Sequence, residues 1–304
     1  MTIDPKPVRS LLFVPANRED RMRKSLTIGA DAVVFDLESA IPRGEAEPAR
    51  AMVRRVIDGH DSGSGPSGPA ERGKRPAVFV RVSEVDSADF GADLDTAVRP
   101  GLDGILLPQV RSVDDVLVAA RALDKRDPDG RVILVPLIET ANAVRTAFEI
   151  ASASPRIAYL GGGVSRDGDI ARSIGYRWSP EGMETLYLRS KVLIDVRAAG
   201  VVNPITGIWG IVDDLDGLAA FARQARDLGY EGLMCIHPTH VPIIHEIFTP
   251  SVEDIAHWRS VVDAMAEAQA QGLGAIRLDG RLIDVAHLHT ARQNLARAQR
   301  LGVI

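Results

Sequence analysis

Eight short apolar runs recur along this chain, and segments with helical patterns lie between them. The runs are residues 10–16, 32–38, 77–83, 104–110, 132–139, 157–163, 203–210 and 232–238. A continuous run of Val, Ile and Leu is typical of a parallel strand that is buried on both faces. Alternation of strands with helices predicts a parallel sheet, and eight repeats predict an α/β protein closed into a TIM (β/α)8 barrel.

Two helical patterns beyond the eighth run exceed what a barrel needs. They cover residues 251–272 and 284–302, with a turn at 278–280 between them. We therefore expect residues 1–250 to form the barrel catalytic domain. Residues 251–304 should form a helical C-terminal arm that packs on its own barrel or on a neighbouring subunit.

Charge and hydropathy exclude several classes of partner. The net charge is −5, so no basic surface indicates nucleic-acid binding. No apolar run approaches the roughly 20 residues of a membrane span, and the first residues lack the apolar core of a signal peptide. The single cysteine, Cys235, excludes an internal disulfide. These observations favour a cytoplasmic location.

Carboxylates stand at the C-terminal ends of three of the runs. Asp36 and Glu38 end the second, Glu139 ends the fifth, and Asp167 and Asp169 follow the sixth. The C-terminal rim of an α/β barrel is where catalytic residues lie. Carboxylate oxygens with open positions suit Mg²⁺ or Mn²⁺. The adjacent positions of the fifth and sixth strands predict that Glu139 and Asp169 share an ion, although each could instead cap a following helix.

Arg81 interrupts the third run, and a buried arginine needs a partner. Its forked guanidinium matches a carboxylate. Two interpretations stay open from the residues alone. Arg81 either holds the carboxylate of a substrate, or it forms a structural ion pair inside the barrel, for instance with Glu38.

The lysines argue against one mechanism. None of the five (Lys6, Lys24, Lys74, Lys125 and Lys191) ends a predicted strand. A Schiff-base aldolase needs a desolvated lysine at the catalytic rim. An enolate stabilised by a metal is therefore the better carbon–carbon chemistry for this chain.

A set of ordered motifs carries a family likeness. They are RSLLFVPANRED (9–20), GADAVVFDLESAI (29–41), VPLIETANAV (135–144), IHPTHVPIIHEIFTPS (236–251) and LIDVAHLHTAR (282–292). With them the chain resembles, over nearly its whole length, the citrate lyase β-subunit-like group of the HpcH/HpaI aldolase superfamily. The resemblance implies a TIM barrel, Mg²⁺, trimers or hexamers, and cleavage or formation of carbon–carbon bonds in 3-hydroxy acids or their CoA thioesters.

The same resemblance implies roles for individual residues. Glu139 and Asp169 match the two metal-binding carboxylates, and Arg81 matches the arginine that holds the oxo-acid carboxylate. Gly168, in the turn before Asp169, is placed at the substrate. Asp284 matches an acid/base aspartate that the arm delivers across a subunit interface, although the residues alone predict only a helix cap. Asp36 and Glu38 are expected to hold metal-bound water or Arg81.

The chain departs from the family pattern at three places. Residues 166–169 read RDGD, followed by Ser173, where relatives have a GAED-like turn and then an aspartate four residues on. Ser39 stands where many relatives have an aspartate, and Ala46 stands where a lysine is common. The last two positions lie near the CoA thioester in relatives, so they favour a site that works without CoA.

We therefore predict a metal-dependent carbon–carbon lyase with Mg²⁺, or Mn²⁺ in its place. Its partners would be a small oxo or hydroxy acid or an acyl-CoA, and its assembly a homotrimer or hexamer. One alternative is a class II aldolase that acts on free 2-oxo acids without CoA. Another is a non-catalytic barrel that binds an acid or serves as a subunit of a lyase complex.

Overall fold

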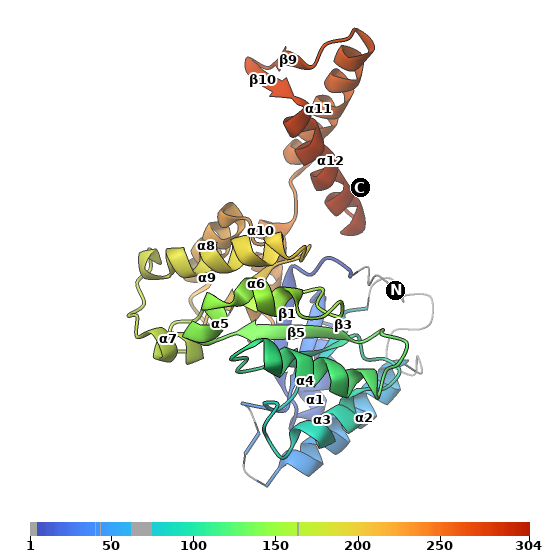
Figure 1. Ribbon diagram of the computed structural model, residues 1–304, viewed down its shortest axis with the longest axis vertical. Helices are drawn as coiled ribbons and strands as arrows, with labels where there is room; N and C mark the ends of the chain where they lie inside the picture. The colour runs from blue at the N-terminus through green and yellow to red at the C-terminus, as the bar shows by residue number, and fades with distance from the viewer. Residues whose placement is uncertain (1–4, 40, 43, 62–74, 163) are drawn as a thin grey trace. The chain divides into compact units, whose positions relative to one another are not determined.

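Eight parallel strands close into a barrel in the computed structural model of the chain (Figure 1). The structure describes residues 5–39, 41–42, 44–61, 75–162 and 164–304. The strands are β1 (Ser10–Pro15), β2 (Ala32–Asp36), β3 (Ala77–Arg81), β4 (Gly104–Leu107), β5 (Ile133–Ile138), β6 (Gly161–Gly162), β7 (Ile205–Ile208) and β8 (Gly232–Cys235). Each pairs with the next, and the register Leu12↔Cys235 between β1 and β8 closes the ring. The predicted TIM barrel is therefore confirmed.

The sixth strand is much shorter than predicted. The sequence favours a strand over 157–163, but only Gly161 and Gly162 pair with neighbouring strands, and residue 163 lies outside the described residues. A Cβ atom on Gly161 would lie 3.0 Å from Leu137, and one on Gly162 would lie 3.3 Å from Val192. Glycine therefore permits a close approach of β6 to β5 and to helix α8 (Met183–Ala198).

Helices cover the outside of the barrel (Figure 1). Besides α8 they are α1 (Glu19–Ser25), α2 (Ala46–Asp61), α3 (Phe90–Ala97), α4 (Val113–Asp124), α5 (Ala141–Arg145), α6 (Ala147–Ser152), α7 (Asp169–Ile174), α9 (Leu215–Leu228) and α10 (His240–Phe248). In α2 the fully buried side chains Ala49, Val53 and Ile57 recur every four residues, which gives the helix one apolar face. Among the described residues, no helix combines the length and apolar character that a membrane crossing requires.

Apolar side chains fill the barrel interior. Val34, Phe79 and Val135 belong to one buried cluster that joins most of the strands. The rings of Phe79 and Tyr159 pack edge to face, with their centroids 5.9 Å apart. Charged residues follow where the strands end, beginning with Asp36 and Arg81, which are register partners at the ends of β2 and β3.

The chain divides into two compact units, Met1–Glu246 and Ile247–Ile304. The second unit contains α11 (Val252–Ala270), β9 (Ala275–Leu278), β10 (Arg281–Asp284) and α12 (Val285–Arg300). Met265, Ile283 and Leu288 belong to its own hydrophobic core. The two antiparallel strands were not expected from the sequence, which predicts only a turn between helices.

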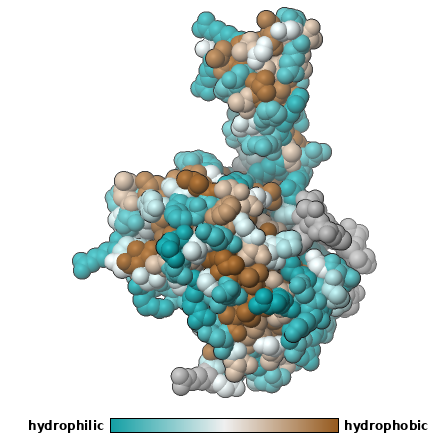
Figure 2. All heavy atoms as spheres, in the orientation of Figure 1, coloured by the Kyte–Doolittle hydropathy of each residue, from teal (hydrophilic) through white to brown (hydrophobic). Residues whose placement is uncertain are grey.

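A two-residue turn makes the hairpin of the second unit. Asp279 and Gly280 both have positive φ, at 48° and 81°. This pair of dihedrals is typical of a type I′ turn, for which Asp-Gly is a favoured sequence. Figure 2 shows hydrophobic side chains on the surface of this unit, and Val252, Leu273 and Leu282 are among its exposed apolar residues.

Candidate active site at the strand ends

The predicted site residues of the barrel lie at the ends of parallel strands. Asp36 and Arg81 are the last residues of β2 and β3, Glu139 follows β5, and Asp169 opens the helix after β6. Because all eight strands run in the same direction, these positions belong to the same rim. The structure therefore brings together residues that are separated by up to 133 positions in the sequence, counted from Asp36 to Asp169.

Arg81 pairs with both acids of the second strand. Its Nε and Nη2 donate to the two carboxylate oxygens of Asp36 at 2.7 and 2.6 Å, and its Nη1 lies 3.0 Å from Glu38 Oε2. The guanidinium also covers the ring of Phe13, 5.1 Å from its centroid. Both the Glu38 pair that the sequence left open and a bidentate Asp36 pair are therefore present.

The Arg81 side chain is only 12% exposed, yet it stays charged. Burial alone would lower the pKa of Arg81, but the hydrogen bonds and charge of Asp36 outweigh it and raise that pKa above its ordinary value. The charges of Glu38 and Glu139 act in the same direction. A guanidinium has five N–H donors, and the contacts in the described residues use three. Arg81 thus keeps donors with which it could bind a ligand carboxylate.

Glu139 is the most perturbed acid of the rim. Burial raises the pKa of Glu139 to about 7, and the charges of Asp169 and Glu38 add to the effect. The backbone N–H of Gln109, at 3.2 Å from Glu139 Oε2, and the charge of Arg81 oppose it. Gln109 has a φ of 50°, an uncommon value for a residue with a side chain. The rim therefore holds a carboxyl group whose charged form lacks full compensation.

Asp169 and Gly168 form the start of α7. Gly168 is the N-cap residue, and a Cβ there would lie 1.9 Å from Ser165 Oγ, so only glycine fits without movement. Asp169 is the first helical residue, and its Oδ1 lies 2.5 Å from Arg172 Nη2. Asp169 is therefore not the cap of α7, although its carboxylate in the first turn interacts favourably with the helix dipole. Asp167 has a side chain that is 88% exposed.

Glu84 is an acid of the same rim that the sequence analysis missed. It follows the predicted strand 77–83 directly, which is the signal that identified Glu139. Burial raises the pKa of Glu84, and the charges of Asp86, Glu38 and Asp169 raise it further, against a smaller effect of Arg111. Glu84 is therefore within electrostatic reach of the predicted site.

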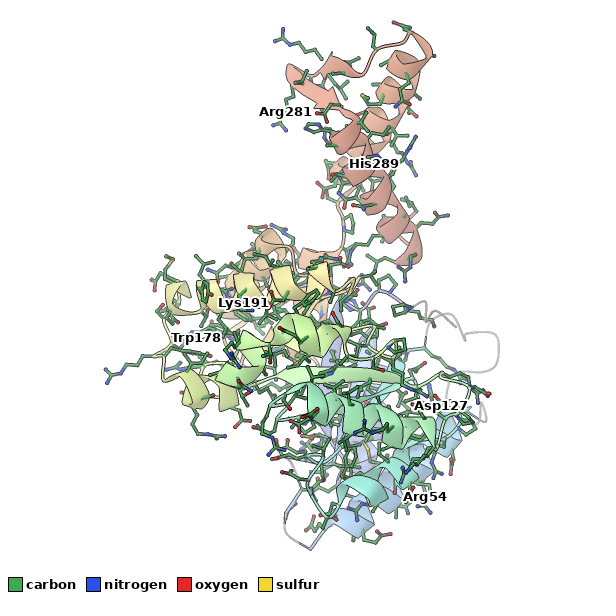
Figure 3. The ribbon with its side chains drawn as sticks, in the orientation of Figure 1. Arg54, Asp127, Trp178, Lys191, Arg281 and His289 are labelled. Carbon is green, nitrogen blue, oxygen red and sulfur yellow. The ribbon has the colours of Figure 1, made fainter. Side chains whose placement is uncertain are left out.

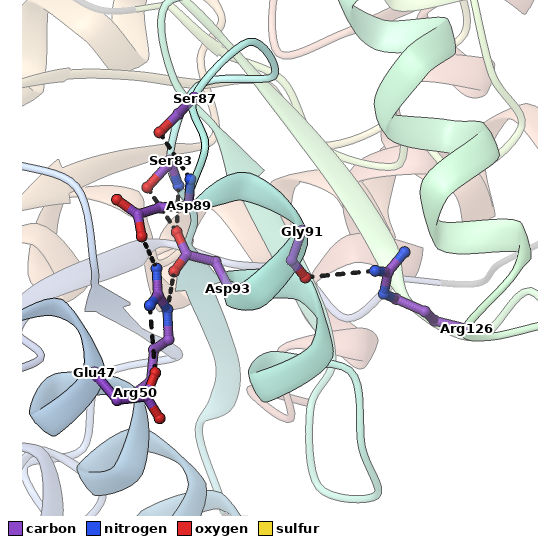
Figure 4. Close-up of polar contacts among 8 residues, drawn as sticks. All are labelled: Glu47, Arg50, Ser83, Ser87, Asp89, Gly91, Asp93 and Arg126. Atoms are coloured by element: carbon purple, nitrogen blue, oxygen red, sulfur yellow. Dashed lines mark hydrogen bonds and ion pairs between the residues drawn. The ribbon is translucent and has the colours of Figure 1, made fainter.

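A buried network holds the backbone next to Glu84 (Figure 4). Asp93 of α3 accepts from Arg50 Nε at 2.7 Å, and its other oxygen accepts from Ser83 N and Ser83 Oγ at 2.8 and 2.7 Å. Arg50 and Asp93 have side chains that are only 7% and 2% exposed. Charged hydrogen bonds in such a buried setting anchor the start of the β3–α3 segment to α2 and α3.

The carboxylates of the rim fit a hard metal ion that takes only one or two of its ligands from the protein. In the part of the chain that the structure describes, no group of three or more His, Cys, Asp and Glu side chains is arranged to hold a metal by itself. Mg²⁺ commonly binds through one or two carboxylates, with waters and substrate oxygens completing its shell. Glu139, whose buried carboxylate is destabilised by Asp169 and Glu38, has the chemistry of such a ligand.

Asp284 lies in the second unit, where it caps α12. Its Oδ1 accepts from the backbone N–H groups of Ala286 and His287 at 3.0 and 3.3 Å, and lies 2.7 Å from His287 Nδ1. The hydrogen bond from His287 holds the pKa of Asp284 below its ordinary value. The cap predicted from the residues alone is therefore present.

The described lysines do not stand at strand ends. Lys191, which Figure 3 labels on α8, pairs with Asp195 one turn further along that helix. Lys24 lies in α1, and Lys125 caps the end of α4. Lys74 lies outside the described residues. Among the described residues the rim thus lacks a lysine for a Schiff base.

The fold and the rim together define a TIM-barrel protein with an acidic enzyme-type site around a buried arginine. The model of the HpcH/HpaI aldolase/citrate lyase family matches residues 9–238, and the chain belongs to this family. The family predicted from the motifs is confirmed, as is the prediction of an enzyme of the lyase type.

Three similar proteins cover nearly the whole chain. A citrate lyase subunit beta-like protein of Deinococcus radiodurans is 35% identical over 97% of this chain and 99% of its own. A (3S)-malyl-CoA thioesterase of Cereibacter sphaeroides is 32% identical over 97% and 96%. The crystal structure of CitE from Mycobacterium tuberculosis, in complex with magnesium, acetoacetate and coenzyme A, is 26% identical, covers 96% of this chain and 98% of its own, and superposes with a TM-score of 0.70.

Proposed function

We propose that the protein is a Mg²⁺-dependent carbon–carbon lyase that cleaves or forms a 3-hydroxy acid or its CoA thioester. One observation carries the proposal. Burial at the rim raises the pKa of Glu139 to about 7, and the like charges of Asp169 and Glu38 add to this effect. A divalent cation bound there would offset these charges, and the magnesium of the similar CitE structure supports this assignment.

Each rim residue has a role in this proposal. Glu139 and Asp169 hold Mg²⁺, with Mn²⁺ as its substitute. Arg81 binds and orients the substrate carboxylate, while Asp36 and Glu38 fix its guanidinium plane through three contacts. The backbone at Gly168 passes close to the substrate. When bound, the metal supplies electrostatic stabilisation of the enolate that develops as the carbon–carbon bond breaks.

The proton transfer falls to the arm. Asp284 of a neighbouring subunit takes the proton of the 3-hydroxyl group as the carbon–carbon bond breaks and gives it to the enolate carbon, and the two transfers are reversed during condensation. This role requires an oligomer in which residues 251–304 reach the next barrel, and we propose a homotrimer or hexamer. We also assign the protein to the cytoplasm, with small acids or acyl-CoA as its partners and neither nucleic acid nor membrane among them.

The alternative is a class II aldolase that acts on free 2-oxo acids without CoA. Ser39 and Ala46 favour it, because they replace an aspartate and a lysine that are common in relatives near the CoA thioester. A barrel that only binds an acid, or that serves as a subunit of a lyase complex, is the third possibility. The relatives are named as a lyase subunit and as a thioesterase, so an acyl-CoA substrate could undergo either carbon–carbon cleavage or thioester hydrolysis.

The test is a substrate panel with the metal as its variable. Chelator-treated protein is assayed with and without Mg²⁺ on malyl-CoA, citramalyl-CoA and free 2-oxo acids. Glyoxylate or pyruvate release reports carbon–carbon cleavage, and free thiol reports thioester hydrolysis. We expect Mg²⁺-dependent release of the oxo acid. Turnover that is unaffected by the chelator, or thiol release alone, would overturn the proposed reaction.

A further inference from the structure

A recess of about 520 Å³ adjoins the rim between the β2–α2 and β3–α3 segments. Its charged lining residues are Glu38, Glu84, Asp86, Asp89 and Arg50. Arg50, the one cation among the described lining residues, is already engaged by Asp93, Asp89 and Glu47. Among the described lining residues, negative charges therefore outnumber positive ones.

Glu84 differs from the other acids of this recess. Glu38 pairs with Arg81, Asp86 with Arg111 and Asp89 with Arg50. Asp86 and Asp89 also have side chains that are 59% and 52% exposed, so water screens their charge. Glu84 is partly buried, and within the described residues its carboxylate has no ion pair. Its charge is consequently the least compensated among the described acids that line the recess.

The position of Glu84 is fixed by its neighbour. Ser83 is bonded through both its N–H and its hydroxyl group to the buried Asp93, which Arg50 holds from α2 (Figure 4). Because these bonds anchor the residue before Glu84, the backbone cannot easily carry the carboxylate away from the recess. A negative group of a ligand in the recess would meet this charge at short range, where the partly buried surroundings weaken screening.

We propose that Glu84 is a specificity-determining residue that disfavours acids with a second free carboxylate. This inference rests on the proposed function, in which Arg81 and the metal ligands hold the first carboxylate. Glu38 belongs both to the Arg81 pair and to the lining of the recess, so the recess lies beside the proposed position of the first carboxylate and could receive the distal part of the ligand. The substrate class is then an acid whose distal end is uncharged, such as a thioester or a methyl group.

Two ligands with the same four-carbon skeleton test the inference. 2-Hydroxybutyrate and malate share the 2-hydroxy acid head and differ in a methyl group against a carboxylate at the distal end. Their dissociation constants are measured by calorimetry on full-length protein loaded with Mg²⁺. We expect the wild type to bind 2-hydroxybutyrate at least about tenfold more tightly than malate. In Glu84→Gln the ratio should fall to within about threefold, through tighter binding of malate.

A matched control removes one negative charge elsewhere. Asp95 is 67% exposed and pairs with Arg126, so Asp95→Asn changes the net charge equally without touching the recess. Its selectivity ratio should equal that of the wild type. Steady-state kinetics add a second readout. Glu84→Gln should lower KM for a dicarboxylate substrate, whereas its kcat on a thioester should not fall by orders of magnitude.

The results separate a failure of the specificity role from a failure of the proposed function. Equal binding of the two ligands by the wild type, or an unchanged ratio in Glu84→Gln, would overturn the specificity role and leave the proposed function intact. A kcat that collapses on every substrate in Glu84→Gln would also overturn it, since Glu84 would then take part in the chemistry. Binding of neither ligand by any of these proteins would overturn the proposed function and this inference with it.

Discussion

The barrel rim and the arm hold their acids in opposite ways. At the rim, Glu139 is partly buried near like charges and its pKa rises to about 7. In the arm, Asp284 is 45% exposed, caps a helix and has a lowered pKa. An uncompensated carboxyl group indicates function from its surroundings alone. A satisfied cap does not, so any catalytic role of Asp284 depends on the surface that the arm meets.

The largest effect should come from the rim. Glu139→Ala removes a proposed metal ligand and should lower Mg²⁺-dependent turnover by at least about 10³-fold. Asp167→Asn serves as the control, because its exposed side chain lies in the same segment as Asp169 but outside the cluster. Steady-state assays of chelator-treated protein across a Mg²⁺ titration measure both. Full activity in Glu139→Ala would remove the metal site from the mechanism.

A smaller loss should follow from a change in the arm. Asp284→Asn keeps an N-cap side chain but cannot exchange a proton, so kcat should fall by roughly 10²-fold while stability stays close to that of the wild type. Asp284→Ala should lose about 1 kcal/mol of stability in addition. Urea unfolding and kcat together separate the two roles.

Mixing the two inactive variants sharpens the comparison further. If the arm of one subunit completes the rim of the next, an assembly of Glu139→Ala with Asp284→Asn subunits contains some complete sites. Dissociation and reassembly of the mixture should then restore part of the activity. No recovery in mixed oligomers verified by mass would mean that Asp284 does not act across a subunit interface.

The raised pKa of Glu139 predicts a pH effect on stability. Between its ordinary pKa of 4.5 and about 7, the folded metal-free protein binds a proton that the unfolded chain has released. Stability should therefore fall as pH rises through this window, by about 3 kcal/mol in total. Glu139→Gln should flatten that part of the profile, as measured by urea unfolding at a series of pH values. An identical slope in both proteins would contradict the burial of this charge.

The smallest effect concerns the hairpin of the arm. Gly280 has a φ of 81°, so Gly280→Ala strains the turn and should cost about 1 kcal/mol of stability. Gly274→Ala is the control, because its added methyl group would meet nothing within 4 Å and its φ is not in the positive range. Chemical denaturation compares the two. Equal losses would show that the turn does not set the stability of this unit.

Local patterns explain what could be predicted of the fold. The eight apolar runs each contain a barrel strand, because a strand buried on both faces needs an unbroken apolar stretch. The sixth run predicted a strand over 157–163, which is longer than the strand observed. Among the described residues of this run, only Gly161 and Gly162 pair with neighbouring strands. The hairpin around Asp279 and Gly280 carried a usable signal, an Asp-Gly turn between alternating apolar residues, that the helical periodicity on either side concealed.

The sequence by itself determined the barrel and the positions of Asp36, Glu139 and Asp169 on its rim, because strand direction and the ends of apolar runs are local properties. Only the tertiary structure decided that Arg81 pairs with Asp36 and Glu38 at once, that Glu139 has a pKa near 7, and that Glu84 belongs to the same rim. These properties depend on burial and on distances between charges far apart in the chain. No local pattern of residues encodes them.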